Sequence, residues 1–317
     1  MSLAVSSVAL AGCRVNRGPV VFERTPKRIA RGSYLAWGPP HCVRCHSELV
    51  QDRPGGHPIP GRELAGIRNQ TGRVAPNLTP DPETGTGTWT DEQLVRAIRE
   101  GVGHDGRQLT AFMPWNAFSA LSDEDVKSIV VYLRSIPAVR NPLPKGVEQD
   151  IDEVTRDRVA LTPPVPPATS DYKNDPVRRG EYLARIGVCA NCHTPIDAED
   201  RRMVSYRFGG GRADAGVAPN LTSDPSGLAH YDENMFIQTI RTGKVGGVRE
   251  LKSGMPWWYV GHLTDDDLRA LFAYLKSAPP VVHRVNTSDD ETLCPICGRK
   301  HGFGSLNVAH PLTAAMH

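Results

Sequence analysis

The chain has 317 residues and a net charge of +2, with basic and acidic side chains interspersed. This length is comfortable for two domains, and the balanced charge excludes the clustered basic face of a nucleic-acid-binding protein. No run of eighteen apolar residues predicts a membrane-spanning helix. Aromatic residues make up only 6% of the chain, while 30 glycines and 27 prolines predict short helices joined by long loops.

Residues 1–27 contain a short apolar run, LAVSSVALAGC, that ends at Cys13. Its last four residues resemble the lipobox of bacterial lipoproteins, in which the cysteine is lipidated and becomes the mature N-terminus. The basic segment that normally precedes such a run is missing. We predict a signal and tether over residues 1–27, with lipidation at Cys13. The alternative is a plain apolar N-terminus with a stray cysteine.

An internal repeat organises most of the remaining chain. The matching segments are RGSYLAW at 31–37 with RGEYLAR at 179–185, APNLTPD at 75–81 with APNLTSD at 218–224, and 113–139 with 255–281, both beginning MPW. The offset between copies falls from 147 at Cys42 and Cys189 to 143 at Asn77 and Asn220 and 142 at the MPW segments, which small loop deletions in the second copy explain. We predict a tandem duplication, with domains at 28–140 and 176–284.

Two further segments lie outside the repeat. Residues 141–175 are rich in proline and predict a linker that is extended and semi-rigid where the prolines cluster. Residues 285–317 form a C-terminal tail with a CxxC pair and two histidines.

Helix signals recur in both copies. Thr90 and Gln93 form a capping box for a helix that Gly101 ends, while Asp232 caps the matching helix and Gly243 ends it. The last helix of each copy begins at Ser122 or Thr264 and has an apolar stripe: Val126, Ile129, Val130 and Leu133, or Leu268, Leu271, Phe272 and Leu275. We therefore predict an all-α fold made of two small helical domains.

Each copy contains a CxxCH motif: Cys42, Cys45 and His46 in the first, Cys189, Cys192 and His193 in the second. The three-residue spacing sets both thiols on one side of a helical turn, where they can add to the two vinyl groups of haem, with the next histidine under the iron. A thioredoxin-like pair would need a βαβ setting, and a zinc half-site would need further repeated ligands. A plain disulfide is the third alternative. The duplicated motif favours two covalently attached haem c groups.

The sixth iron ligand is predicted from the repeat as well. Met113 and Met255 are the one soft or imidazole ligand that recurs in register after both motifs, each just before a proline and the closing helix. A proline restricts the preceding residue to extended conformations, which suits a loop that presents a thioether. His57 and His104 have no partner in the second copy, so we predict that both are solvated loop residues.

The residues quoted above resemble the class I cytochrome c family, and the chain is identified as a di-haem member. Its NLTPDPETGTGTWTDEQLVRAIREGVGHDGRQL…MPW segment is similar to cytochrome c subunits of membrane-bound alcohol, gluconate and sorbitol dehydrogenases. That group typically has three haem domains, whereas two are found here. The resemblance implies that the Asn77 and Asn220 loops lie along the haem edges. It also raises an indole N–H of Trp115 or Trp257 as a propionate donor, although core packing is the preferred role.

Ligation by histidine and methionine fills both axial positions and favours outer-sphere electron transfer. We therefore expect an electron carrier, not an enzyme by itself, between a dehydrogenase or quinol-oxidising complex and an oxidase or another cytochrome. The alternative is a di-haem redox enzyme, such as a peroxidase or a thiosulfate-oxidising cytochrome, with one open iron. Haem attachment follows export, so we expect a periplasmic location, anchored to the membrane if Cys13 is lipidated.

The C-terminal tail almost repeats the motif but lacks the adjacent histidine. Cys294, Cys297, His301 and His310 form a set that is chemically competent to bind zinc, with an irregular spacing. The sequence is equally consistent with a Cys294–Cys297 disulfide and two exposed histidines.

Overall fold

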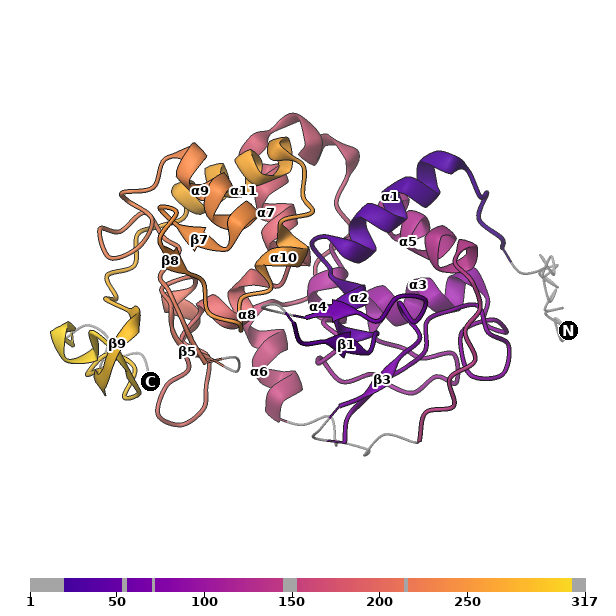
Figure 1. The fold of residues 1–317 in the computed structure, drawn as a ribbon, viewed down its shortest axis with the longest axis horizontal. Helices are drawn as coiled ribbons and strands as arrows, with labels where there is room; N and C mark the ends of the chain where they lie inside the picture. Colours follow the sequence, from indigo (N-terminus) through magenta and orange to yellow (C-terminus); the bar gives the residue numbers. More distant parts are fainter. Residues whose placement is uncertain (1–19, 53–55, 70–71, 145–152, 214–215, 310–317) are drawn as a thin grey trace, which may run out of the picture.

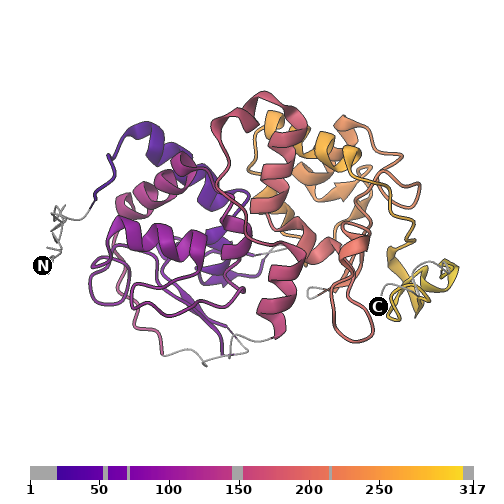
Figure 2. The same cartoon turned by 180° about the vertical axis from the view of Figure 1, so that it is seen from behind.

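The computed structural model describes residues 20–52, 56–69, 72–144, 153–213 and 216–309. Two helical halves lie side by side along the long axis, and the C-terminal hairpin lies at the end farthest from the first described residues (Figures 1 and 2). The predicted lipidation site, Cys13, and His310 are outside the described residues.

The two halves contain corresponding helices. In the first half these are α1 (Pro26–Trp37), α2 (Cys42–Cys45), α3 (Asp91–Glu100), α4 (Trp115–Phe118) and α5 (Asp123–Ser135). In the second half they are α7 (Pro176–Ile186), α8 (Cys189–His193), α9 (Glu233–Thr242), α10 (Trp257–Val260) and α11 (Asp265–Ser277).

The helix ends follow the predicted signals. The capping box of α3 is present, since the Thr90 hydroxyl accepts from the Gln93 N–H at 3.2 Å and the Gln93 side chain accepts from the Thr90 N–H at 2.8 Å. Asp232 accepts from the N–H of Met235 at 2.7 Å and caps α9. Gly101 and Gly243 end these helices in the left-handed conformation, at φ 66° and 69°.

In each half the first helix crosses the last one at a glycine. A Cβ atom at Gly32 in α1 would collide with the carbonyl oxygen of Ser128 in α5, and one at Gly180 in α7 would collide with that of Ala270 in α11. Only glycine allows the two backbones to come this close. The repeated RG-x-Y sequence therefore marks the crossing point of the outer helices.

The prediction of an all-α chain holds for the helical cores but misses the strands. Among the described residues there are five two-stranded antiparallel sheets. They pair β1 (Leu49–Val50) with β2 (His57–Pro58), β3 (Ile67–Arg68) with β4 (Val74–Ala75), β5 (Gly211–Ala213) with β6 (Gly216–Ala218), β7 (Lys244–Val245) with β8 (Arg249–Glu250), and β9 (Asn286–Leu293) with β10 (Lys300–Gly302). Most of these strands have two or three residues, too few to show an alternating pattern, and β9 is largely polar and exposed.

The segment between the two repeats is more structured than the predicted linker. It contains helix α6 (Glu153–Leu161) and the short 3₁₀ helix η1 (Ser170–Asn174), while the proline cluster between them is without regular structure. Helix α6 lies at the junction of the two halves (Figures 1 and 2). No helix in the described part of the chain is both long and apolar enough to cross a membrane.

The two halves share one hydrophobic core. Buried apolar residues of both form a single continuous cluster, which includes the predicted stripe of α5 and Leu268, Leu271 and Leu275 of α11. Phe272 is only partly buried and packs against this cluster.

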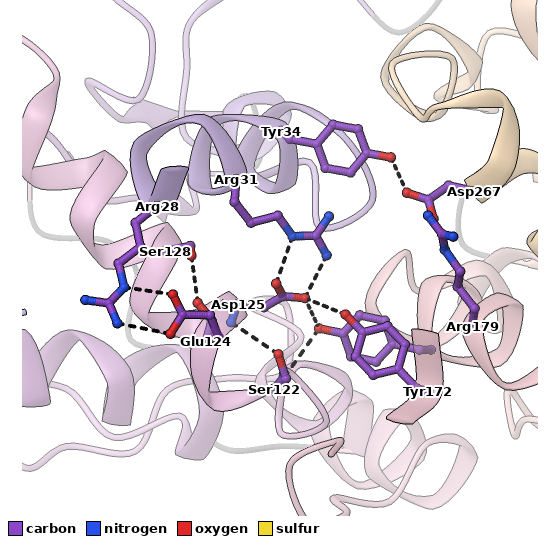
Figure 3. A network of polar contacts seen from close by, with 11 residues as sticks. Arg28, Arg31, Tyr34, Ser122, Glu124, Asp125, Ser128, Tyr172, Arg179 and Asp267 are labelled. Carbon is purple, nitrogen blue, oxygen red and sulfur yellow. Dashed lines mark hydrogen bonds and ion pairs between the residues drawn. The ribbon is translucent and has the colours of Figure 1, made fainter. Parts of the chain in front are cut away.

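A reciprocal polar contact joins the halves (Figure 3). Tyr34 of α1 donates its hydroxyl hydrogen to Asp267 of α11 and accepts from the N–H of Thr264 at 3.1 Å. In the same way, Tyr182 of α7 donates to Asp125 of α5 at 2.6 Å and accepts from the N–H of Ser122 at 3.4 Å. Each repeated tyrosine thus binds the first turn of the last helix in the other half.

The two aspartates are also bound within their own half. Arg31 forms a bidentate pair with Asp125, with both N–O distances at 2.8 Å, and Arg179 contacts Asp267 at 2.5 Å. Tyr172 adds a further hydrogen bond to Asp125 at 3.1 Å. Burial alone would raise the pKa of Asp125, but the Arg31 guanidinium and the tyrosine hydroxyls outweigh this and lower it.

We predict that Asp125→Asn lowers the free energy of unfolding by about 3 kcal/mol, because it leaves the Arg31 guanidinium without its buried carboxylate. The lowered pKa means that this contribution is complete above the ordinary carboxyl pKa and is lost as the pH falls through the lowered value. The gap between variant and wild type should therefore close only below about pH 4. Denaturant unfolding measured across pH tests both points.

Glu124→Gln is the matched control, since the Arg28–Glu124 pair is exposed and its loss should cost under about 1 kcal/mol. Equal stabilities of the two variants would contradict the role given to Asp125.

Candidate haem-binding sites

Both CxxCH motifs lie on very short helices with the same entry geometry. Helices α2 and α8 carry the cysteines, and the residue before each is left-handed, His41 at φ 38° and Val188 at φ 49°. Non-glycine residues adopt this conformation only at a cost, and such strain is typical of functional sites. The shared backbone shape indicates that both copies present their thiols in the same way.

Each motif histidine is oriented by a proline carbonyl. Nδ1 of His46 lies 2.8 Å from the oxygen of Pro76, and Nδ1 of His193 lies 2.9 Å from that of Pro219. The Nδ1–H donates to the carbonyl, so Nε2 is the nitrogen left for a metal. Burial lowers the pKa of both imidazoles, which favours the neutral form that a ligand needs.

The two prolines were not singled out from the sequence. Both prolines lie in the repeated APNLT segment, which was recognised. Their role could not be predicted, because every residue has a carbonyl oxygen and the residue type does not show which one accepts a hydrogen bond. The asparagines that follow are buried and act on the backbone: Asn77 donates to the carbonyl of Val139 at 2.7 Å, and Asn220 to that of Val281 at 2.8 Å.

The motif cysteines are thiols in an apolar setting. Burial raises the pKa of Cys42 and Cys189 to about 12 and also raises that of Cys45. None of the six cysteines in the described residues is in a disulfide. A thioredoxin-like function would require a thiol with a lowered pKa, so the raised pKa values disfavour that alternative.

The predicted methionines occupy equivalent turns. The Met113 N–H donates to Thr110 O at 3.2 Å and the Met255 N–H to Lys252 O at 3.0 Å. The carbonyl of each methionine accepts from the tryptophan two residues later, Trp115 or Trp257, at 2.7 and 2.8 Å. These turns hold both thioethers at the wall of the same cavity.

That cavity has a volume of about 1550 Å³ and is lined by all eight predicted site residues: Cys42, Cys45, His46, Met113, Cys189, Cys192, His193 and Met255. Its walls include the apolar stripes predicted for the closing helices, among them Ile129, Leu133, Leu271 and Leu275. Pockets for one ligand usually have volumes of about 300–1,000 Å³, so this space suits two large flat groups. The residues therefore fit two haems.

Arginine side chains at the cavity wall could meet acidic groups. Arg44, within the first motif, lines the cavity, and its Nε is buried with no hydrogen-bond partner among the described residues. Arg73, Arg107 and Arg249 also line it. An apolar interior with cations at its walls matches a haem, which has an apolar ring and two carboxylates.

The two motifs approach each other closely. A Cβ atom on Gly187 would lie 3.7 Å from the carbonyl oxygen of Pro39 and 3.5 Å from the Cys189 sulfur. Gly187 and Pro39 each precede a motif by two or three residues, so the segments that lead into the two motifs lie next to one another.

Helix α6 connects the methionine loop of the first half to the motif of the second. The Ala111 N–H donates to Thr155 Oγ1 at 3.2 Å, and Arg158 donates to the Ala111 carbonyl at 3.1 Å. On its other side, Asp157 binds the backbone and guanidinium of Arg202 at 2.8 and 3.1 Å. Arg202 in turn donates to the carbonyls of Asn191 and Thr194, beside the second motif.

The remaining predictions have mixed outcomes. His57 lies beside Asp52 and His104 stacks on Trp89, and neither lines the cavity. The indole N–H of Trp115 donates to the Leu109 carbonyl at 3.1 Å. The N–H that was considered as a donor to a haem propionate is therefore already in a hydrogen bond.

In the tail, Cys294, Cys297 and His301 lie together, and the fourth member of this cluster is His283, which was not predicted from the sequence.

Two helical domains with paired CxxCH motifs define the class of c-type cytochromes. Residues 29–137 match the family described as cytochrome c, and residues 175–275 match that described as cytochrome c oxidase, cbb3-type, subunit III. The chain therefore belongs to the cytochrome c family, with two cytochrome c-type domains in tandem. Domains of this kind bind haem c.

Several relatives match most of this chain. It is 29% identical over 312 residues to the cytochrome c subunit of the quinone alcohol dehydrogenase of Gluconobacter oxydans, covering 88% of this chain and 61% of the relative. It is 31% identical over 294 residues to the fructose dehydrogenase cytochrome subunit of Gluconobacter japonicus, covering 85% and 57%. A diheme cytochrome c-type protein of Cereibacter sphaeroides is 25% identical over 286 residues, covering 84% and 91%. The chain thus spans about three fifths of the length of the two dehydrogenase subunits.

We predict that Asp157→Asn destabilises the fold by about 3 kcal/mol, because the Arg202 side chain is only 1% exposed and would lose its carboxylate. Denaturant unfolding followed by circular dichroism gives the measurement. Glu199→Gln, which breaks an exposed pair with Arg201, is the control and should change stability by less than about 1 kcal/mol. If the two variants were equally stable, the Asp157–Arg202 pair would not hold α6 against the second half.

Proposed function

We propose that this chain is an electron carrier with two haem c groups, which receives electrons from a dehydrogenase or quinol-oxidising complex and delivers them to a terminal acceptor. The observation that carries this proposal is the single cavity lined by both CxxCH motifs and both methionines. Two redox groups within one apolar space would lie close enough to exchange electrons, which two separate pockets would not ensure.

In this proposal Cys42, Cys45, Cys189 and Cys192 form the covalent links, and the axial ligand pairs are His46 with Met113 and His193 with Met255. When bound, haem supplies a one-electron couple. The chain's residues exclude water from it, hold each imidazole through a proline carbonyl and offer a thioether, all of which favour a high reduction potential.

The dehydrogenase is supported as donor by the names of the relatives, which are cytochrome subunits of alcohol and fructose dehydrogenases. A cytochrome c subunit of gluconate 2-dehydrogenase from Pantoea cypripedii, 30% identical over 292 residues, adds to this support. We extend the proposal to an extracytoplasmic location with a lipid anchor at Cys13, and to domain limits of 28–140 and 176–284.

We predict that Met113→Leu and Met255→Leu each open one iron. Each variant should lose about half of the weak near-infrared band of sulfur-bound ferric iron and should bind carbon monoxide when reduced, whereas the wild type should not respond to cyanide or peroxide. Met203→Leu is the matched control, because Met203 is buried against the tail cysteines and does not line the cavity. A wild-type protein that binds peroxide would favour a redox enzyme instead.

We further predict that both haems are needed for electron transfer. In source-organism membranes that lack this chain, the wild type should restore oxygen uptake driven by alcohol, fructose or gluconate. The double variant Cys189→Ser, Cys192→Ser, which cannot attach the second haem, should restore none. Full activity of this variant would contradict a relay, and no activity of the wild type with any donor would contradict the dehydrogenase partner.

A further inference from the structure

We infer that the C-terminal tail is held to the second domain by a structural zinc ion bound to His283, Cys294, Cys297 and His301. One ligand atom from each residue lies within 4.8 Å of the others, and all four side chains are buried. The Cys294 sulfur is 3.4 Å from His283 Nε2. Around a tetrahedral zinc ion, sulfur and nitrogen ligands are about 3.4–3.8 Å apart, so only a small contraction is needed.

His283 is already oriented as a ligand. Its Nδ1 lies 3.1 Å from the carbonyl oxygens of both Gly209 and Gly210, so this nitrogen carries the hydrogen and Nε2 is directed at Cys294. A backbone carbonyl on the far nitrogen is the usual arrangement for a histidine that binds a metal.

Comparison of the two repeats shows what is special about this histidine. Asn141 is the corresponding residue of the first copy, two positions after Val139 as His283 is two positions after Val281. The Asn141 amide donates to the carbonyls of Ala65 and Gly66 at 2.8 and 3.3 Å, which is the same backbone contact. The imidazole retains this contact and adds a second nitrogen, which faces the thiols of a tail that the first copy lacks.

His301 supplies the second imidazole. It is fully buried on β10, its Nδ1 lies 3.0 Å from the Gly302 oxygen, and its Nε2 has no hydrogen-bond partner among the described residues. A buried polar atom without a partner costs about 1–3 kcal/mol, and a metal bond would remove that cost. The ring lies 5.0 Å from that of His283, nearly perpendicular to it.

The tail buries little apolar surface. Among the described residues its buried cluster is Cys294 and Cys297 with Met203, and most of β9 is exposed. Surface ion pairs such as Arg212–Glu291 and Arg299–Asp200 also join the tail to the second domain, but exposed pairs of this kind contribute little stability. A unit with so small a core usually needs a disulfide or a metal ion to fold stably. A Cys294–Cys297 disulfide would staple only the turn between the cysteines, and it would leave the buried Nε2 atoms of both histidines without a partner.

The ligand set identifies the metal class. Two thiolates and two imidazoles in a closed, four-membered site are typical of structural zinc, with no position left for a substrate. Ligands come from the end of the second repeat and from the hairpin, which lies beside β5 and β6 (Figure 1). Gly210 also donates its N–H to the carbonyl of His193 at 2.9 Å, so the site lies directly behind the second haem motif.

The test is metal analysis of the full, haem-loaded chain purified from a periplasm without added zinc. We expect about one zinc for every two irons. On unfolding with chelator, Cys294 and Cys297 should both react as free thiols, counted by peptide mapping so that Cys13 does not contribute. His283→Asn introduces the residue of the first copy, which can keep the bonds to Gly209 and Gly210 but offers no metal ligand. It should lower the zinc content at least about tenfold while both haems stay attached.

Two controls define the ligand set. Asn141→His places an imidazole where no thiols are near and should bind no additional zinc, and His310→Ala should leave the zinc content unchanged. Zinc-free wild type with a Cys294–Cys297 disulfide, or full zinc in His283→Asn, would overturn the inference. If His283→Asn failed to fold, cobalt substitution of the wild type would decide, since thiolate-to-cobalt bands must appear. The zinc readout is independent of electron transfer.

Discussion

The arrangement of the whole molecule depends on one reciprocal contact, in which Tyr34 and Tyr182 each bind an aspartate in the other half. Each tyrosine hydroxyl donates to the aspartate and accepts from the N-cap backbone of the same helix, so it fixes both position and direction. Arginines from the same repeated segment pair with the two carboxylates and offset the free-energy cost of burying these charges. Because the contact is made twice, around an approximate two-fold axis, the two halves cannot slide past one another without breaking both.

This fixed relation explains why the two haem sites open into one space. The motif helices lie on the facing sides of the two halves, and Pro39 of one approaches Gly187 of the other. Helix α6 then braces the site from outside, since it binds the loop before Met113 and, through Arg202, the backbone of the second motif. Under the proposed function, one shared space lined by candidate ligands of matching type would suit electron exchange between two bound haems. The reciprocal tyrosine contacts would help to keep the distance between them constant.

The duplication shows which features of the two motif sites are shared and which differ. Both copies keep the left-handed entry to the motif, the proline carbonyl behind the histidine and the methionine turn. They differ where the chain leaves the domain: Asn141 leads into the segment that contains α6, and His283 leads into the cysteine hairpin. In both places the side chain binds the loop behind the axial histidine, so each extension is attached to the same structural position of its own domain.

The sequence by itself predicted the local features: the CxxCH motifs and the methionines in register as candidate haem ligands, the helix caps and the repeat. Each depends on residue type, on short spacing or on the repeat itself. It also predicted that the closing helices have one apolar face, and part of that face lines the cavity. Only the tertiary structure showed which backbone groups and which residues distant in sequence contact these side chains. The carbonyls of Pro76 and Pro219, the exchanged tyrosines, the bracing role of α6 and the recruitment of His283 to the tail cysteines all depend on segments brought together in space. Spacing along the chain cannot reveal such contacts, because a backbone oxygen or a residue far away in sequence leaves no periodic signal.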